Sequence, residues 1–468
     1  MYNVRNTNSN KKYCVKILHK GINGAFCSNF SIFQIEISIK QKVFDGSRRL
    51  LKERTVLMQK NILIAQSGGP TAAINATLSG VIREGLRHEV IGNIYGALNG
   101  IQGALERRLI ELKSQLTTEK QFKMLESTPA MALGSCRYKL PAYDKSPAVY
   151  EEIRNIFHKY GIGYFFYVGG NDSMDTALKL SDYFTACNDD IRVIGLPKTI
   201  DNDLYGTDHT PGYGSAAKFI ATAMAEIARD CDAYNLNSVT IVEIMGRNAG
   251  WLTAASVLPR KAGAAVPQLV YMPEVPFDLS AFLNDVKRLH AERHTVLVAV
   301  SEGIRFADGR YVSESEQSDV TDSFGHRYLS GAGKLLERLV AENLGCKVRS
   351  VELNILQRCS SHLLSATDIN EARCVGQAAV QFALEGRTGV MAAIKRAKNE
   401  PYAFDIGTVP LKEVAGLERR FPLEWITPSG NDLTDDVFPY LLPLIAGEIQ
   451  SPTVNGIPEF FNFNKAVV

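Results

Sequence analysis

Short apolar runs alternate with stretches of helical spacing between about residues 60 and 385. The runs at 162–168 and 295–300 are almost entirely apolar, which is typical of parallel strands buried on both faces. The stretches 174–184 and 279–292 place their apolar residues on one helical face. This alternation predicts an α/β fold with two doubly wound, Rossmann-like lobes. The functional site is then expected in the cleft between the lobes, at the carboxyl ends of the strands.

Further elements follow from the same pattern. We expect strands at 58–65, 90–96, 191–195, 238–244 and 266–272, a strand-like run from Arg349 to Arg358, and helices at 72–88, 147–160, 212–229 and 368–384. Eight of the 18 prolines follow residue 400. Because proline interrupts regular hydrogen bonding, we expect loops and short helices there rather than a third sheet.

The pattern divides the chain into four parts. We expect an N-terminal extension of unknown role at 1–57, a first lobe at 58–212, a second lobe at 213–358 and a C-terminal wrapping tail at 401–468. Part of 359–400 is expected to pack back on the first lobe. The extension is rich in Asn, Ser and Lys at first and ends in a basic run. Translation from Met58 would omit it.

Composition limits the possible partners. The 468 residues are 45% hydrophobic and 22% charged, and 52 basic against 50 acidic residues give a net charge of +2. This balance does not call for nucleic acid or an anionic membrane, and no apolar run reaches the roughly 18 residues of a membrane helix. The eight cysteines form no CxxC pair. We therefore expect a cytoplasmic protein with reduced thiols.

The loop from Pro197 to Asp203 holds the most concentrated chemistry. Lys198, Thr199, Asp201 and Asp203 follow directly after the predicted strand 191–195. A carboxylate beside a lysine is held ionised, as a general base next to an anionic substrate requires. An Asx-rich surface turn is the alternative interpretation of this loop.

Two glycine loops lie upstream, each between a strand and a helix. Gly68 and Gly69 follow the first predicted strand, and Gly169 and Gly170 precede Asn171-Asp172-Ser173. Free backbone N–H groups at a helix start can bind an anion, although a plain strand-to-helix turn has the same pattern. Asp172 could cap its helix, hold a metal together with Asn171, or repel part of a ligand.

Taken together, the motifs resemble those of the phosphofructokinase family over about residues 60–385. The matching residues are Gly68-Gly69, Gly169-Gly170-Asn171-Asp172-Ser173, Pro197-Lys198-Thr199-Ile200-Asp201-Asn202-Asp203, Met245-Gly246-Arg247, Glu302, Arg349 and Gln357-Arg358. The resemblance implies Mg²⁺-dependent phosphorylation of the 1-hydroxyl of fructose 6-phosphate, and a homodimer or homotetramer.

The resemblance also implies roles for single residues. Asp201 would accept the proton of the sugar hydroxyl, with Lys198 and Asp172 beside it, and the donor would contact Gly69, Gly170 and Arg137. The sugar phosphate would be bound by Thr199, Asp203, Met245, Gly246, Arg247, Glu302, Arg349, Ile355 and Arg358. The metal would be held by Asn171 and Asp172, although Asn171 replaces an aspartate of other members. Ile355 also departs from the family pattern, because many members have histidine or tyrosine there.

Two positions bear on the phosphoryl donor. In the ATP-dependent members of the family that this chain resembles, glycine stands at the positions of Asp172 and Lys198. At these two positions the chain is similar to the pyrophosphate-dependent members, which have the aspartate and the lysine. A carboxylate about 4 Å from the α-phosphate of a nucleotide would repel it by about 4 kcal/mol at an effective dielectric constant near 20. The alternatives are an ATP-dependent enzyme that tolerates both residues, and a non-catalytic regulatory subunit or sugar-phosphate sensor.

Overall fold

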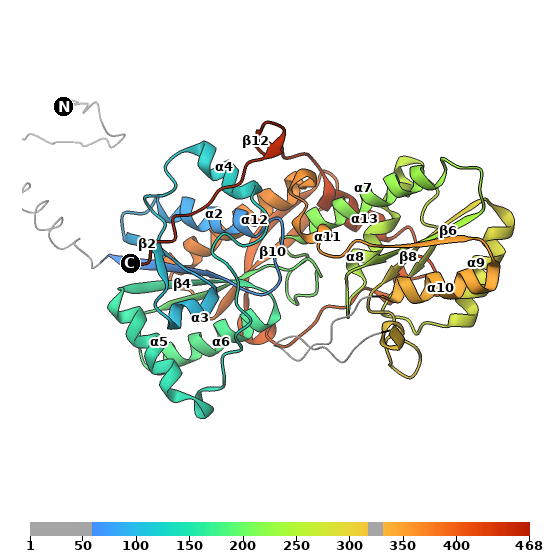
Figure 1. Ribbon diagram of the computed structural model, residues 1–468. Helices are drawn as coiled ribbons and strands as arrows, with labels where there is room; N and C mark the ends of the chain where they lie inside the picture. The colour runs from blue at the N-terminus through green and yellow to red at the C-terminus, as the bar shows by residue number, and fades with distance from the viewer. Residues whose placement is uncertain (1–58, 317–330) are drawn as a thin grey trace, which may run out of the picture. The chain divides into compact units, whose positions relative to one another are not determined.

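The computed structural model describes residues 59–316 and 331–468. The N-terminal extension expected at 1–57 lies outside the described residues. Two sheets organise the described part of the chain (Figure 1). No helix among the described residues is long and apolar enough to cross a bilayer.

The first sheet has seven strands in the order β11-β10-β5-β4-β1-β2-β3. They are β1 (Lys60–Gln66), β2 (Ile91–Ala97), β3 (Leu109–Glu111), β4 (Ile162–Gly169), β5 (Arg192–Pro197), β10 (Val390–Lys398) and β11 (Ala403–Pro410). The five central strands are parallel, whereas β3 and β11 run antiparallel at the two edges. The polar loops after β1, β4 and β5 therefore lie at one edge of the sheet.

Helices cover both faces of this sheet (Figure 1). One face carries α2 (Ile74–Gly85), α4 (Glu119–Ser127) and α12 (Ala366–Leu384), and the other carries α3 (Gly100–Leu105), α5 (Pro147–Lys159) and α6 (Asn171–Ala186). The helices α2 and α12 approach closely, because a Cβ atom on Gly80 would lie 2.1 Å from the backbone oxygen of Arg373. This face thus depends on a residue without a side chain.

The second sheet has four parallel strands in the order β7-β8-β6-β9. They are β6 (Ser238–Ile244), β7 (Leu269–Tyr271), β8 (Thr295–Ser301) and β9 (Lys347–Glu352). One face packs on α7 (Tyr213–Cys231), α8 (Trp251–Ala254) and α13 (Val437–Leu441), and the other on α9 (Leu279–Glu292) and α10 (Ala332–Leu344). The predicted α/β class with two doubly wound lobes is confirmed.

Two expectations about single elements are wrong. The run from Arg349 to Arg358 is not one strand, because β9 ends at Glu352 and Asn354 takes a left-handed φ of 42° before the short helix α11 (Leu356–Cys359). Residues 401–468 are not only loops and short helices, since β11 pairs with β10 at the edge of the first sheet. A β-hairpin of β12 (Thr453–Val454) and β13 (Ile457–Pro458) also lies there.

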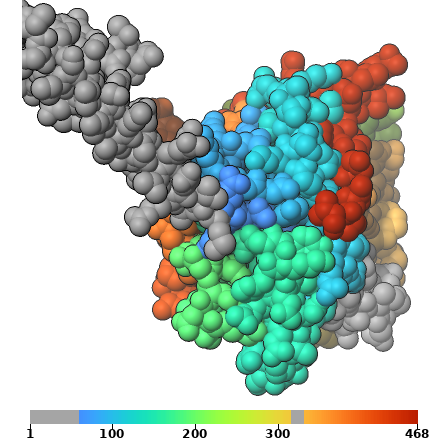
Figure 2. All heavy atoms as spheres, turned by 90° about the vertical axis from the view of Figure 1, so that its left-hand side faces the viewer, coloured from blue at the N-terminus to red at the C-terminus, as the bar shows by residue number. Residues whose placement is uncertain are grey.

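The end of the chain returns to the first lobe. The backbone N–H of Phe461 donates to Thr128 Oγ1 over 2.9 Å, and that of Val468 donates to the backbone oxygen of Leu109 over 2.9 Å. Phe461 is buried in the core formed by α2 and α4. Figure 2 shows this last segment, in red, lying against the cyan residues that follow β3.

Candidate functional site

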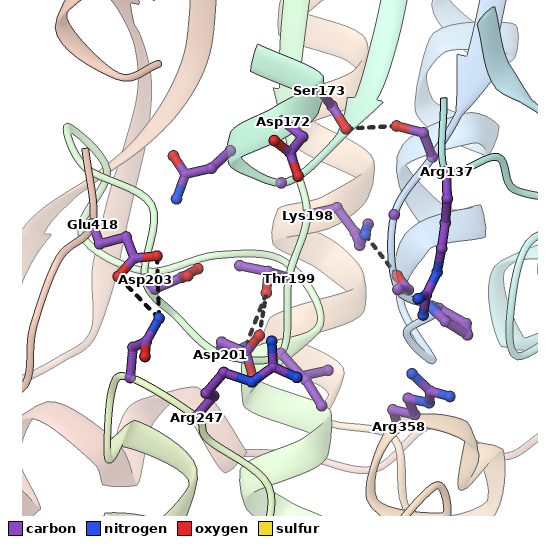
Figure 3. A pocket seen from close by; sticks show the side chains of 18 of the residues that line it. Arg137, Asp172, Ser173, Lys198, Thr199, Asp201, Asp203, Arg247, Arg358 and Glu418 are labelled. Carbon is purple, nitrogen blue, oxygen red and sulfur yellow. Dashed lines mark hydrogen bonds between the residues drawn. The ribbon is translucent and has the colours of Figure 1, made fainter. Parts of the chain in front are cut away.

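A cavity of about 340 Å³ opens at the carboxyl ends of strands from both sheets (Figure 3). The loops after β1, β4 and β5 of the first sheet contribute to it, as do those after β6 and β8 of the second. Thirteen of the residues predicted to form the site line it: Gly69, Arg137, Gly170, Asn171, Asp172, Lys198, Thr199, Asp201, Asp203, Met245, Arg247, Glu302 and Arg358. Parallel strands bring these distant segments to a common edge.

Lys198 joins two of these loops. Its Nζ donates a hydrogen bond of 2.6 Å to the backbone oxygen of Gly69, and the residue is only 2% exposed. Gly68 has a φ of 79°, and a Cβ atom there would lie 3.2 Å from the ammonium group. Burial lowers the pKa of Lys198 to about 8, although Asp201 and Asp203 favour the charged form. The lysine is thus a nearly desolvated cation inside the cavity.

The N-terminus of α6 forms another wall. Gly170 is its N-cap, Asn171 and Asp172 are its first two residues, and the Oγ atoms of Ser67 and Ser173 are 2.5 Å apart. The Asp172 side chain is 48% exposed, with its Oδ1 3.8 Å from Lys139 Nζ. The free N–H groups and the positive end of the helix dipole favour an anion here, while Asp172 limits how large it can be.

Two carboxylates occupy the centre of the cavity. The backbone N–H of Asp201 donates to Thr199 Oγ1 over 3.1 Å, which fixes the turn between them. Burial raises the pKa of the Asp201 carboxyl, and Lys198 opposes this rise. Burial also raises the pKa of Asp203 to about 7, with further contributions from Asp201 and Glu418. Both groups therefore hold a proton more tightly than a carboxylate in water does.

The loops after β6 and β8 supply the opposite wall. The backbone N–H of Gly246 donates to Glu302 Oε1 over 3.2 Å, and the N–H of Met245 donates to Gln357 Oε1 over 3.3 Å. Gly246 itself is not among the lining residues, although its N–H orients Glu302. Burial raises the pKa of Glu302 to about 8, so that this carboxyl is largely protonated at neutral pH. Arg247 and Arg358 add positive charge to the same region.

Charge is distributed unevenly across the cavity. In the view of Figure 3, Arg137 and Arg358 lie on one side and Asp203 and Glu418 on the other. Lys198 and Asp201 lie between them. An anionic group is therefore favoured near the arginines, and a hydroxyl-bearing or cationic group is favoured near the acids.

The structure does not bring two predicted residues into this cavity. Arg349 lies on the edge strand β9, where its Nη1 is 2.9 Å from Asp230 Oδ2, and it borders a separate small hollow with Tyr234 and Lys347. Ile355 is 54% exposed and does not line the cavity. The expected strand-like run opened at Arg349 and included Ile355, but β9 ends at Glu352 and the turn at Asn354 follows it.

Other residues that line the cavity were not predicted from the sequence. They include Tyr138, Thr176, Asn248 and Glu418. Asn248 Nδ2 lies 3.3 Å from Glu418 Oε2, and the backbone at Glu418 forms an isolated bridge with Leu204. Asn248 directly follows the Met245-Gly246-Arg247 motif, and this position next to a motif could have indicated that it lines the site. Glu418 has no such local signal, because it comes from the C-terminal segment.

The donor set fits a hard cation such as Mg²⁺. Asn171 Oδ1 is buried without a hydrogen-bond partner, which leaves an oxygen available at the α6 N-terminus. Carboxylates of Asp172, Asp201 and Asp203 line the same cavity. The described residues contain no cluster of three His, Cys, Asp or Glu side chains arranged to hold a metal. Mg²⁺ typically binds through one or two protein oxygens together with substrate phosphates and water.

Comparison with known proteins agrees with this geometry. Residues 61–383 match the family model described as phosphofructokinase. The pyrophosphate–fructose 6-phosphate 1-phosphotransferase of Halomonas elongata is 40% identical over 412 residues, covering 87% of this chain and 97% of the relative. The identically named protein of Methylococcus capsulatus has the same identity and coverage. The crystal structure of pyrophosphate-dependent phosphofructokinase from Marinobacter aquaeolei superposes with a TM-score of 0.77 at 38% identity, covering 87% of this chain and 97% of that one.

Proposed function

Because the chain belongs to the phosphofructokinase family, we propose that it transfers a phosphoryl group from pyrophosphate to the 1-hydroxyl of fructose 6-phosphate. The products are fructose 1,6-bisphosphate and phosphate. The observation that carries this proposal is the buried ammonium of Lys198 and the carboxylate of Asp172 in one cavity with Asp201.

Asp201 is suited to act as the general base. Its burial raises the pKa of the carboxyl and so gives the carboxylate a higher affinity for a proton, and Lys198 opposes this rise. The carboxylate takes the proton of the sugar 1-hydroxyl as that oxygen forms a bond to the nearer phosphorus. The bond from that phosphorus to the bridging oxygen breaks, and its electron pair stays on the departing phosphate.

Lys198 is suited to stabilise the departing phosphate. Negative charge grows on that group during transfer, and a fixed cation in a nearly water-free place stabilises it strongly. Gly69 and Gly170 allow close approach of the backbone, and Arg137 adds a second cation. Mg²⁺ held by Asn171 and Asp172 would neutralise part of the pyrophosphate charge.

The acceptor is proposed to bind against Met245, Arg247, Glu302 and Arg358. Arginines offer paired N–H donors to a phosphate, and the protonated Glu302 carboxyl can donate to a sugar oxygen. Thr199 and Asp203 close the same side of the cavity. Gly246 contributes through the N–H that orients Glu302.

Asp172 also disfavours a nucleotide, although less strongly by charge than the sequence-based figure suggests. The side chain is half-exposed and Lys139 lies nearby, so solvent and counter-charge reduce the repulsion. The charge effect then falls between about 1 kcal/mol, as in water, and about 4 kcal/mol at a dielectric constant near 20. The bulk of Asp172 and Lys198, where glycines would leave space, supplies the remaining discrimination.

A homodimer or homotetramer in the cytoplasm is part of the proposal. Arg349 and Ile355 lie outside the cavity of their own chain, on or just after the partly exposed edge strand β9. Contact between copies would give both residues a route to a sugar phosphate. The six described cysteines carry free thiols, as in a reducing compartment. Light scattering after size-exclusion chromatography tests the assembly, and a monomer that is fully active would contradict it.

The test of the reaction is product formation from fructose 6-phosphate and pyrophosphate with Mg²⁺. We expect one phosphate released per fructose 1,6-bisphosphate, and loss of the reaction on chelation. Asp201→Asn should lower kcat by about 10²- to 10⁴-fold while fructose 6-phosphate binding persists. The exposed Asp182→Asn is the matched control and should behave as the wild type. A wild type that binds sugar phosphate without turnover with any donor would indicate a sensor instead.

A further inference from the structure

Asn202 lies between the two carboxylates at the centre of the cavity. It is fully buried and has a left-handed φ of 54°, which a non-glycine residue adopts only where its surroundings support it. Because Asp201 and Asp203 are its direct neighbours, the backbone conformation at Asn202 sets the directions in which both carboxylates leave the chain.

The side chain of Asn202 is held at both ends. Its Oδ1 accepts a hydrogen bond of 3.0 Å from the backbone N–H of Thr210, and its Nδ2 donates one of 2.8 Å to the hydroxyl of Tyr440. The Tyr440 hydroxyl in turn donates over 2.8 Å to the backbone oxygen of Asp208. One hydroxyl therefore connects Asn202 to Asp208, two points of the loop between β5 and α7.

Tyr440 is itself rigidly placed. It lies in α13, is 9% exposed, and its ring centroid is 5.1 Å from that of Trp251 and 5.7 Å from that of Trp425. Residues 384–468 lie outside the range that matches the family model. The support of the central loop is thus supplied by a segment that the family motifs do not include.

A second contact from the same segment holds the other side of the loop. The backbone N–H of Arg419 donates over 2.7 Å to the backbone oxygen of Asp203, and its Nη2 lies 3.3 Å from the Tyr440 hydroxyl. The guanidinium of Arg419 packs over Trp251 at 4.3 Å. The C-terminal segment therefore contacts the backbone of Asp203 and the side chain of Asn202 at the same time.

We propose that Tyr440 is a positioning residue for phosphoryl transfer, because its hydroxyl fixes Asn202 and through it the directions of the Asp201 and Asp203 carboxylates. This inference rests on the proposed function of those carboxylates. Tyr440 itself does not line the cavity in which the substrates are proposed to bind. Its effect is therefore expected on kcat, through the direction of the Asp201 carboxylate, and not on the binding of pyrophosphate.

The test replaces Tyr440 by phenylalanine, which removes the hydroxyl and keeps the ring. The matched control is Tyr271→Phe, because Tyr271 is also buried and its hydroxyl donates to Asp285 Oδ2 over 3.2 Å, in the other core of the second lobe. Tyr440→Phe loses the hydrogen bonds of its hydroxyl with Asn202, Asp208 and Arg419, and Tyr271→Phe loses the one with Asp285, so both should show a lower melting temperature. Only Tyr440→Phe should lower kcat, by about 10- to 100-fold, because small displacements of reacting groups have effects of that size. The KM for pyrophosphate should change by less than about threefold.

A double-mutant cycle separates positioning from general loss of stability. Asn202→Gly retains the left-handed backbone but removes the side chain on which Tyr440 acts. In the Asn202→Gly background, Tyr440→Phe should have no further effect on kcat. Additive effects of the two substitutions, or equal kcat losses in Tyr440→Phe and Tyr271→Phe, would overturn the proposal.

The readout does not depend on the identity of the donor. Turnover is measured with whichever of pyrophosphate and ATP the wild type uses, so failure of the proposed donor leaves the test intact. A crystal structure of Tyr440→Phe supplies a readout without turnover. The proposal requires a changed backbone at Asn202 or turned carboxylates, and an unchanged loop would contradict it even in an inactive protein.

Discussion

The ammonium group of Lys198 and the backbone oxygen of Gly69 are joined by a hydrogen bond of 2.6 Å. This contact connects the loop after β5 to the loop after β1 across the first sheet, although β4 lies between the two strands. A single glycine at position 198 would remove both the cation and the link. One side chain, Lys198, therefore both supplies a positive charge to the proposed donor site and holds two of its loops together.

The protonation of Lys198 should limit activity at alkaline pH. Burial lowers its pKa to about 8, so the free enzyme loses the cation as the pH rises through that value. We expect kcat/KM for pyrophosphate to fall above about pH 8, since kcat/KM reports the free enzyme. In Lys198→Arg the guanidinium stays charged, and the alkaline fall should move upward or disappear even if activity is reduced. An unchanged alkaline limb in this variant would exclude Lys198 as its source.

Removing both distinguishing side chains should change the preference for the donor. In Asp172→Gly with Lys198→Gly, space opens at the α6 N-terminus and beside Gly68, and one negative and one positive charge disappear. We expect turnover with Mg-ATP to rise relative to turnover with Mg-pyrophosphate by at least about tenfold, which corresponds to about 1.4 kcal/mol. Steady-state kinetics with each donor measure the ratio. The single variants serve as controls, and an unchanged ratio in the double variant would show that neither side chain selects the donor.

Glu302 should act as a neutral group at pH 7. Burial raises its pKa to about 8, and the nearby Asp201 and Glu243 carboxyls contribute to the rise. Glu302→Gln therefore imitates the protonated form, and its KM for fructose 6-phosphate should stay within about threefold of the wild-type value at pH 7. Glu302→Asp keeps the acid but shortens the side chain, and it should raise KM more. A large increase in KM for the glutamine variant at pH 7 would show that the ionised form binds the sugar.

A buried histidine should make stability fall with rising pH. His209 Nε2 lies 2.6 Å from Glu371 Oε2, and its Nδ1 lies 2.7 Å from Asp208 Oδ2. Burial alone would lower the pKa of His209, but the two carboxylates outweigh it and raise the pKa to about 9. Arg396 Nη2 pairs with the same oxygen of Asp208, Oδ2, over 3.0 Å, and the Tyr402 hydroxyl donates to Glu371.

The sign of the effect follows from the raised pKa. The folded chain holds the proton more tightly than the unfolded chain, so the stabilisation is complete below about pH 6.5 and is lost as the pH rises through about 9. Its size is on the order of 3 kcal/mol. Denaturation at several pH values measures it, and His209→Gln should flatten the dependence across this window. The exposed His362→Gln is the control and should follow the wild type. Equal slopes in all three proteins would contradict the prediction.

The sequence predicted the centre of the site because its residues follow strands directly. Lys198, Asp201 and Asp172 lie within a few residues of β5 and β4, and adjacent parallel strands bring such loops together without further information. The strands could be recognised because both are short and largely apolar. For these loops, the position of each residue directly after a strand was enough to predict that they lie together.

The contribution of the C-terminal segment could not be predicted in the same way. Glu418 and Tyr440 reach the loop at 201–203 only because the chain returns more than 200 residues later, and no local pattern marks that return. The strand β11 contains Asp405 and Gly407, which have low strand propensity, and pairing with β10 determines its conformation. Arg349 lies outside the cavity of its own chain because β9 is the edge strand of the second sheet, a position that no local pattern marks.

The most direct test of the central claim compares the two donors on the wild-type protein. Initial rates are measured with fructose 6-phosphate saturating and with Mg-pyrophosphate or Mg-ATP varied. Since Asp172 and Lys198 leave space for two linked phosphates and disfavour a nucleotide, kcat/KM should be at least about tenfold higher with Mg-pyrophosphate. A kcat/KM for Mg-ATP equal to or above that for Mg-pyrophosphate would contradict the account.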